Sequence, residues 1–94
     1  MLLPPKEIRT LQDAILAIHG CESIYRKTVH VPEKLHGKVR WDGLVKVFKL
    51  IRHPQATRCY AWSYRDGRGI KLAAILEVPP VDSAESAVKS NAAF

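Results

Sequence analysis

A chain of 94 residues is shorter than the length at which proteins usually divide into several domains. We therefore expect a single domain over residues 1–94 with a small hydrophobic core. Its 47% hydrophobic and 26% charged residues are typical of a soluble globular protein and exclude disordered, collagen-like and low-complexity classes. The two cysteines, the absence of a signal-like start and the lack of an apolar run of about 20 residues predict a cytoplasmic protein with no membrane association. We expect residues 1–5 and the last few residues to be disordered.

The first predicted element is a helix over residues 6–19. Apolar residues recur at helical spacings of three, four and three, which is typical of a helix with one buried face: Ile8, Leu11, Ile15 and Ile18. Gly20 follows where a helix commonly ends in a left-handed residue.

Four stretches rich in β-branched and aromatic residues follow, and they predict strands over residues 23–31, 39–52, 58–64 and 70–78. Pro32 is expected to end the first of them, a short edge strand, and residues 32–38 are expected to form a loop. His53-Pro54 predicts a chain reversal, and Pro79-Pro80 the end of the sheet.

The last predicted element is a short helix with Asp82 as its N-cap and Glu85 completing a capping box. The order of elements predicts an α+β fold. In this fold a three- to four-stranded antiparallel sheet carries an N-terminal and a C-terminal helix, both packed on one face.

The turn at residues 66–69 leaves two registers open for the last hairpin. A two-residue turn pairs residue 63 with 70 and 61 with 72, which places the small residues of the strand against the core. A three-residue loop pairs 64 with 70 and 62 with 72, which places the aromatic residues there instead. In the first case Tyr60, Trp62 and Tyr64 lie on an outer face.

The charge of the chain is concentrated in its middle. Residues 26–71 hold twelve Lys and Arg against three Asp and Glu, a net charge of +9, whereas the two ends together carry −3. A concentrated positive charge of this kind favours an anionic partner, either a nucleic acid or an acidic protein. Single-stranded nucleic acid binds where aromatic rings stack on bases and cations contact phosphates. We therefore expect a binding surface on the outer sheet face made of Arg40, Lys46, Arg58, Tyr60, Trp62 and Lys71.

Three other interpretations of these residues remain open. The cations also fit a surface that only keeps a small protein soluble, and the aromatic residues fit an ordinary core. An outer face on which Leu44, Phe48 and Leu50 also alternate fits a homodimer interface.

Catalytic and metal-binding patterns are weak in this chain. His19, Cys21, His53 and Cys59 match no zinc-ligand spacing, so we expect no metal and no cofactor. A small enzyme using Cys59 or the histidines is the alternative from another class, but Cys59 lies in the middle of a predicted strand, where an exposed nucleophile is not expected. We therefore predict a non-catalytic protein.

The order of helix, three strands and helix, with a basic sheet, resembles the double-stranded RNA binding domain. In that family, lysines at the start of the last helix bind phosphates. The corresponding positions here are Asp82, Ser83, Ala84 and Glu85, so the resemblance concerns topology alone.

A second resemblance is to small bacterial proteins of unknown function. They carry a similar string of short motifs, of which this chain has His19-Gly20-Cys21, Trp41-Asp42-Gly43, Val47-Phe48, His53-Pro54, Cys59-Tyr60-Ala61-Trp62 and Leu76-Glu77-Val78-Pro79-Pro80-Val81. The similarity covers about residues 8–88. It implies a stand-alone bacterial domain and no particular activity.

Overall fold

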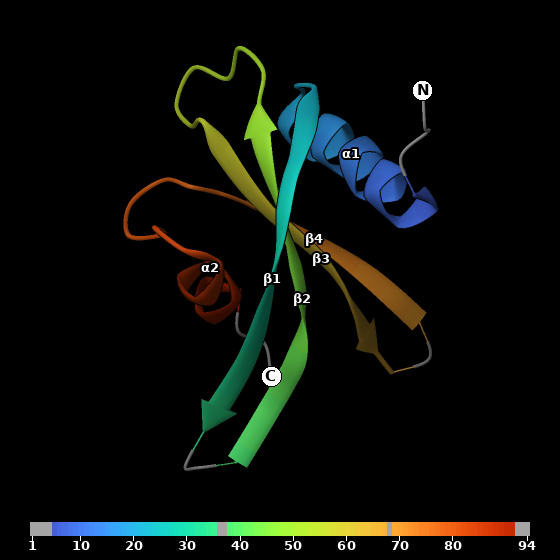
Figure 1. The fold of residues 1–94 in the computed structure, drawn as a ribbon, viewed down its shortest axis with the longest axis vertical. Coiled ribbons are helices and arrows are strands. Elements are labelled where there is room, and N and C mark those ends of the chain that lie inside the picture. Colours follow the sequence, from blue (N-terminus) through green and yellow to red (C-terminus); the bar gives the residue numbers. More distant parts are fainter. Residues whose placement is uncertain (1–4, 36–37, 68, 92–94) are drawn as a thin grey trace.

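The computed structural model describes residues 5–35, 38–67 and 69–91, with residues 33–35, 38–41 and 66 described by their backbone only. Of the residues expected to be disordered, 1–4 and 92–94 lie outside this description, whereas Pro5 is described and directly precedes α1. The elements are α1 (Lys6–His19), β1 (Ser23–Leu35), β2 (Lys38–Leu50), β3 (Arg58–Asp66), β4 (Gly69–Leu76) and α2 (Ala84–Ser90). The strands form one antiparallel sheet in the order β1-β2-β3-β4 (Figure 1). The predicted α+β fold is therefore confirmed.

Helix α1 has the predicted bounds. Ile8, Leu11 and Ile15 are buried, whereas Ile18 is exposed because the stripe turns away from the sheet in the last turn. Gly20 ends the helix with φ of 71°, and its N–H donates to the Leu16 carbonyl at 2.9 Å. A left-handed residue at this place satisfies a carbonyl that the helix leaves unpaired.

The two helices cover opposite faces of the sheet, which corrects the expectation that both pack on one face (Figure 1). Successive side chains of a strand point to opposite faces. On β3, Cys59 and Ala61 pack with α1, whereas Tyr60 and Trp62 pack with α2. Both faces of this central strand are apolar, and each helix buries one of them.

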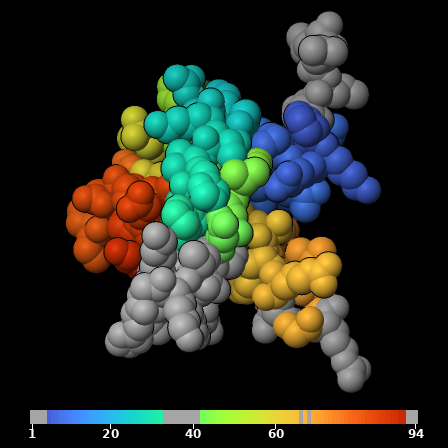
Figure 2. All heavy atoms as spheres, turned by 60° about the horizontal axis from the view of Figure 1, so that its bottom comes forward, coloured from blue at the N-terminus to red at the C-terminus, as the bar shows by residue number. Residues whose placement is uncertain are grey.

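The α1 side of the core is built from Phe48 and Leu50 of β2 together with the small residues of β3 and β4. The α2 side is larger in side-chain volume. It gathers Trp62 with residues of all four strands, of the segment before α2 and of α2 itself: Val31, Val45, Val47, Tyr60, Ala73, Val81, Ala84, Ala87 and Val88. In Figure 2 the edge strand β1 lies between α2 and α1 at the surface.

The first hairpin is longer than the sequence predicts. Residues 32–38 were expected to form a loop, but β1 continues to Leu35 and β2 begins at Lys38, with residues 36–37 outside the description. Pro32 lies opposite Asp42 within the ladder. Because β1 is an edge strand, a residue without an N–H can be accommodated there without losing a hydrogen bond inside the sheet.

The last hairpin adopts neither of the two expected registers. Ser63 pairs with Leu72 and Ala61 with Ala74, and Asp66 pairs with Gly69 at the turn. This pairing is shifted by two residues from the first expected register. A shift of two residues leaves every side chain on its face, so the small residues of β3 lie with Leu72 on the α1 side, as that register predicts.

The ladder between the two central strands is the shortest of the three in the sheet. Strands β2 and β3 pair over only four residues each, Lys46–Lys49 with Arg58–Ala61, while both outer ladders continue further. The two hairpins consequently diverge toward their tips (Figure 1). Among the described residues, no helix is long and apolar enough to cross a membrane.

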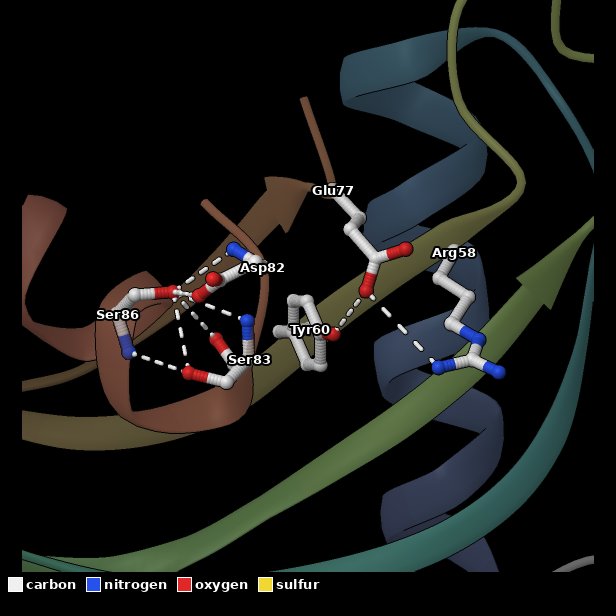
Figure 3. A network of polar contacts seen from close by, with 6 residues as sticks. All are labelled: Arg58, Tyr60, Glu77, Asp82, Ser83 and Ser86. Atoms are coloured by element: carbon white, nitrogen blue, oxygen red, sulfur yellow. Dashed lines mark hydrogen bonds and ion pairs between the residues drawn. The ribbon is translucent and has the colours of Figure 1, made fainter. Parts of the chain in front are cut away.

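Helix α2 begins one residue later than predicted. Ser83 caps it, and its hydroxyl oxygen accepts from the Ser86 N–H at 3.1 Å. The Ser86 hydroxyl oxygen accepts from the Ser83 N–H at 3.0 Å, so Ser86 completes the capping box in place of Glu85 (Figure 3). Asp82 lies just outside the helix, where its carboxylate accepts from Ser86.

Candidate anion-binding site

The two aromatic residues of the expected binding surface are buried. Trp62 is 0% exposed and Tyr60 is 3% exposed, because α2 and Val81 cover this face of β3. No base can stack on a ring that the protein already covers on both sides. The expectation of an open aromatic sheet face is therefore wrong.

The cations of the expected surface whose side chains are described do not form one patch. Lys46 is 7% exposed and lies on the α1 side, with its Nζ 3.8 Å from Oε1 of Glu7. Arg40 has its side chain outside the description. Arg58 and Lys71 are both exposed, but Lys71 pairs with Tyr64, six residues along β3 from Arg58 and thus about 20 Å away.

The expected dimer surface is also occupied within the chain. Phe48 and Leu50 are buried against α1, and only Leu44 of the three apolar residues stays exposed. The face on which the homodimer hypothesis depends is thus part of the core.

A different cluster of cations surrounds Arg58. Arg26, Lys49, Thr57 and Arg58 line a hollow of about 230 Å³ at the end of the sheet, which we call the basic hollow. These residues come from β1, from β2, from the residue preceding β3 and from its first residue. Arg26, Lys49 and Arg58 are all exposed.

The register of the sheet explains how these residues meet. Lys49 and Arg58 are direct partners in the β2–β3 ladder. Arg26 is the extra residue of a β-bulge, because Tyr25 pairs with Phe48 and Lys27 already pairs with Val47. A bulge redirects the side chain of the inserted residue. Three cations from three neighbouring strands thereby border one hollow.

Glu77 is the carboxylate that pairs with this cluster. Its Oε2 lies 4.0 Å from Nη1 of Arg58 and also accepts a hydrogen bond from the Tyr60 hydroxyl (Figure 3). Burial of the ring, together with that hydrogen bond, raises the pKa of Tyr60 to about 12. Tyr60 therefore stays neutral and holds Glu77 beside Arg58.

Arg58 also borders a second hollow of about 230 Å³. It lies between the sheet and the start of α2, where Lys27 faces a segment that contains Asp82 and Glu85. The charges on its two walls are opposite in sign. The basic hollow thus differs from its neighbour, because none of the described residues that line it carries a carboxylate.

Cys59, His53 and His19 make contacts within the fold. Burial raises the pKa of Cys59 to about 12, and the nearby Cys21 adds to this shift. The His53 Nδ1 accepts from the backbone N–H groups of Gln55 and Ala56, each at 3.1 Å. Nε2 of His19 lies 2.7 Å from the carbonyl oxygen of Ala74, to which it donates. Within the described ranges, no three His, Cys, Asp or Glu side chains are grouped so that they could hold a metal ion.

We expect thiol reagents to distinguish the two cysteines. At pH 8 iodoacetamide should modify Cys21, which is half-buried, and should reach Cys59 only after denaturation, because a buried thiol with a raised pKa has almost no thiolate. Peptide mass spectrometry of native and denatured samples measures this. The folded protein holds the thiol proton of Cys59 more tightly than the unfolded chain does, because its pKa is raised from 9.0 to about 12. The contribution of Cys59 to the free energy of unfolding is therefore complete below pH 9 and is lost as the pH rises toward 12. Rapid native labelling of Cys59 would contradict the prediction and support a reactive thiol.

Of the basic hollow, sequence reasoning found Arg58 and missed Arg26, Lys49 and Thr57. A usable signal existed for Lys49, since a tight reversal centred on His53-Pro54 pairs residues 49 and 58. No signal existed for Arg26, because a bulge depends on how the whole ladder twists.

The chain was compared with protein-family models, with curated proteins and with solved structures, and none of the three comparisons found a match.

Proposed function

We propose that this protein is a non-catalytic module that binds an anionic partner, a nucleic acid or an acidic protein surface, through the basic hollow. The observation that carries the proposal is the meeting of three exposed cations around one hollow, of which, among the described residues, only Arg58 pairs with a carboxylate, that of Glu77. Clustered positive charge attracts anions over several ångströms and speeds their association.

The contact surface proposed here replaces the one expected from the sequence. Arg58 is retained, whereas Tyr60, Trp62 and Lys46 act in the core. A cytoplasmic location is part of the proposal, because both cysteines are free thiols and the cytosol keeps thiols reduced.

Removing the three cations should weaken binding more than removing three cations elsewhere. The variant Arg26→Gln/Lys49→Gln/Arg58→Gln is compared with Lys6→Gln/Arg9→Gln/Lys89→Gln, which loses the same charge at exposed positions of α1 and α2. Binding of a labelled single-stranded oligonucleotide and of polyglutamate is measured by fluorescence anisotropy across a salt series. If the partner is nucleic acid, the binding constant falls as salt rises, and log K plotted against log salt has a negative slope. This slope should become less steep by about 2 in the first variant only, since each of the three lost phosphate contacts contributes about 0.7.

Two results would count against the proposal. One is the absence of binding to either polyanion by the wild type at low salt. The other is an equal loss in both triple variants, which would mean that only the net charge of the protein matters. Preference for polyglutamate over the oligonucleotide would identify the partner as an acidic protein.

A further inference from the structure

We infer that the basic hollow is a binding site for one phosphomonoester group, an inference that rests on the proposed function and names the chemistry its site recognises. The first observation is the cross-strand pair. Lys49 and Arg58 lie directly opposite each other in the ladder and on the same face of the sheet. Like charges in such a pair destabilise a sheet.

The second observation is that the fold adds a third cation to this unfavourable pair. Arg26 enters through a bulge, which interrupts the ladder between β1 and β2. Bulges often occur beside functional sites, where they redirect a side chain. Within the described residues neither Arg26 nor Lys49 has an ion pair or a side-chain hydrogen bond. The arrangement costs stability in the free protein, and a bound anion would offset that cost.

The charge of the site matches a phosphomonoester better than a carboxylate. Among the described residues, three cationic side chains line the hollow and one of them, Arg58, pairs with Glu77, which leaves two positive charges without an ion pair. A phosphomonoester carries a charge of about −1.5 to −2 at pH 7, whereas a carboxylate or a backbone phosphodiester carries −1. Two guanidinium groups, one ammonium group and the Thr57 hydroxyl can donate hydrogen bonds to phosphate oxygens from several directions. A planar guanidinium group can donate two parallel hydrogen bonds to two oxygens of the same phosphate.

The size of the basic hollow also favours a single group. Its volume of about 230 Å³ is below the roughly 300–1,000 Å³ of sites that enclose a whole small molecule. The phosphate would therefore be held in the hollow while the rest of its carrier lies outside. A free phosphorylated metabolite and the 5′-phosphate end of a nucleic acid share this chemistry.

Thermal unfolding with inorganic phosphate as the probe tests the inference. At pH 7.5, phosphate should raise the Tm of the wild type by about 4–8 °C relative to sodium chloride of equal ionic strength, once phosphate reaches about five times its Kd. Arg26→Gln and Lys49→Gln should abolish this difference. Lys6→Gln/Arg9→Gln/Lys89→Gln should retain it, and this variant also shows any general salting effect of phosphate, which acts on all variants equally.

The Tm of the protein without phosphate is a second measurement, and a general salt effect does not change it. Lys49→Gln should raise the Tm in sodium chloride above that of the wild type, because it removes the repulsion from Arg58. A 5′-phosphorylated oligonucleotide should bind more tightly than the same oligonucleotide with a 5′-hydroxyl, and equal binding of the two would overturn the site. The source of the phosphate is then distinguished by comparison with a nucleoside 5′-monophosphate. Tighter binding of the 5′-phosphorylated oligonucleotide than of the monophosphate identifies a nucleic-acid end, and equal binding of these two identifies a free phosphorylated molecule.

The outcomes separate this inference from the proposed function. A wild type that binds polyanions in a salt-dependent way but gains no phosphate-specific Tm, or gains it equally in Arg26→Gln, overturns the phosphate site and leaves the proposed function standing. Absence of both effects overturns the two together.

Discussion

Replacing Trp62 with alanine is expected to lower the free energy of unfolding by about 3–5 kcal/mol, the range for truncating a fully buried aromatic side chain. Domains of this size rarely exceed the lower part of the usual 5–15 kcal/mol, so the variant should be unfolded to a large extent at 37 °C. The reason is the position of the indole between the sheet and α2, where it belongs to a core cluster with residues of all four strands and of α2. Urea denaturation followed by circular dichroism measures the change.

The control for Trp62→Ala is Ile70→Ala, which removes a large apolar side chain that is 71% exposed. This control should change stability by less than about 0.5 kcal/mol. Trp62→Phe, which removes fewer atoms, should give an intermediate loss and remains measurable if the alanine variant does not fold. Equal stability of Trp62→Ala and Ile70→Ala would show that the indole is not covered, and the aromatic binding surface would then have to be reconsidered.

Placing a carboxylate at Val88 is expected to release α2 from the sheet. Val88 is 0% exposed on the apolar side of the helix, and an unpaired charge there would be desolvated without a partner. Val88→Asp should lower the free energy of unfolding by at least about 3 kcal/mol. In a Trp41→Phe background Trp62 is the only indole, since the chain has two tryptophans. Its fluorescence should shift to longer wavelength and become accessible to acrylamide.

Lys89→Asp is the matched control, because it places the same carboxylate on the exposed side of the same helix. Its Trp62 emission should stay that of the wild type. If both aspartate variants left the emission unchanged, α2 would not be the element that covers the aromatic face. If Val88→Asp gained affinity for single-stranded oligonucleotides, the released face would have the stacking capacity that the sequence suggests.

These two experiments concern the step at which sequence reasoning failed. The alternation of residues 58–64 predicts correctly that Tyr60, Trp62 and Tyr64 share a face opposite Cys59 and Ala61. It does not say which face meets water. In this protein both faces meet a helix, and the weak apolar stripe of α2 gave little reason to expect that such a short helix would bury an indole.

The sequence by itself determined the elements whose signals are local. Helix α1, its glycine end and the four strands follow from side-chain spacing and from backbone preferences, which act within a few residues. Only the tertiary structure decided which helix covers which face, how far the first hairpin extends past Pro32, and which cations meet. These depend on contacts between residues far apart in the chain: a bulge at Arg26 and a ladder partner for Lys49 exist only once the sheet has formed. The candidate site therefore lies where strands meet, and no single segment of the chain carries its pattern.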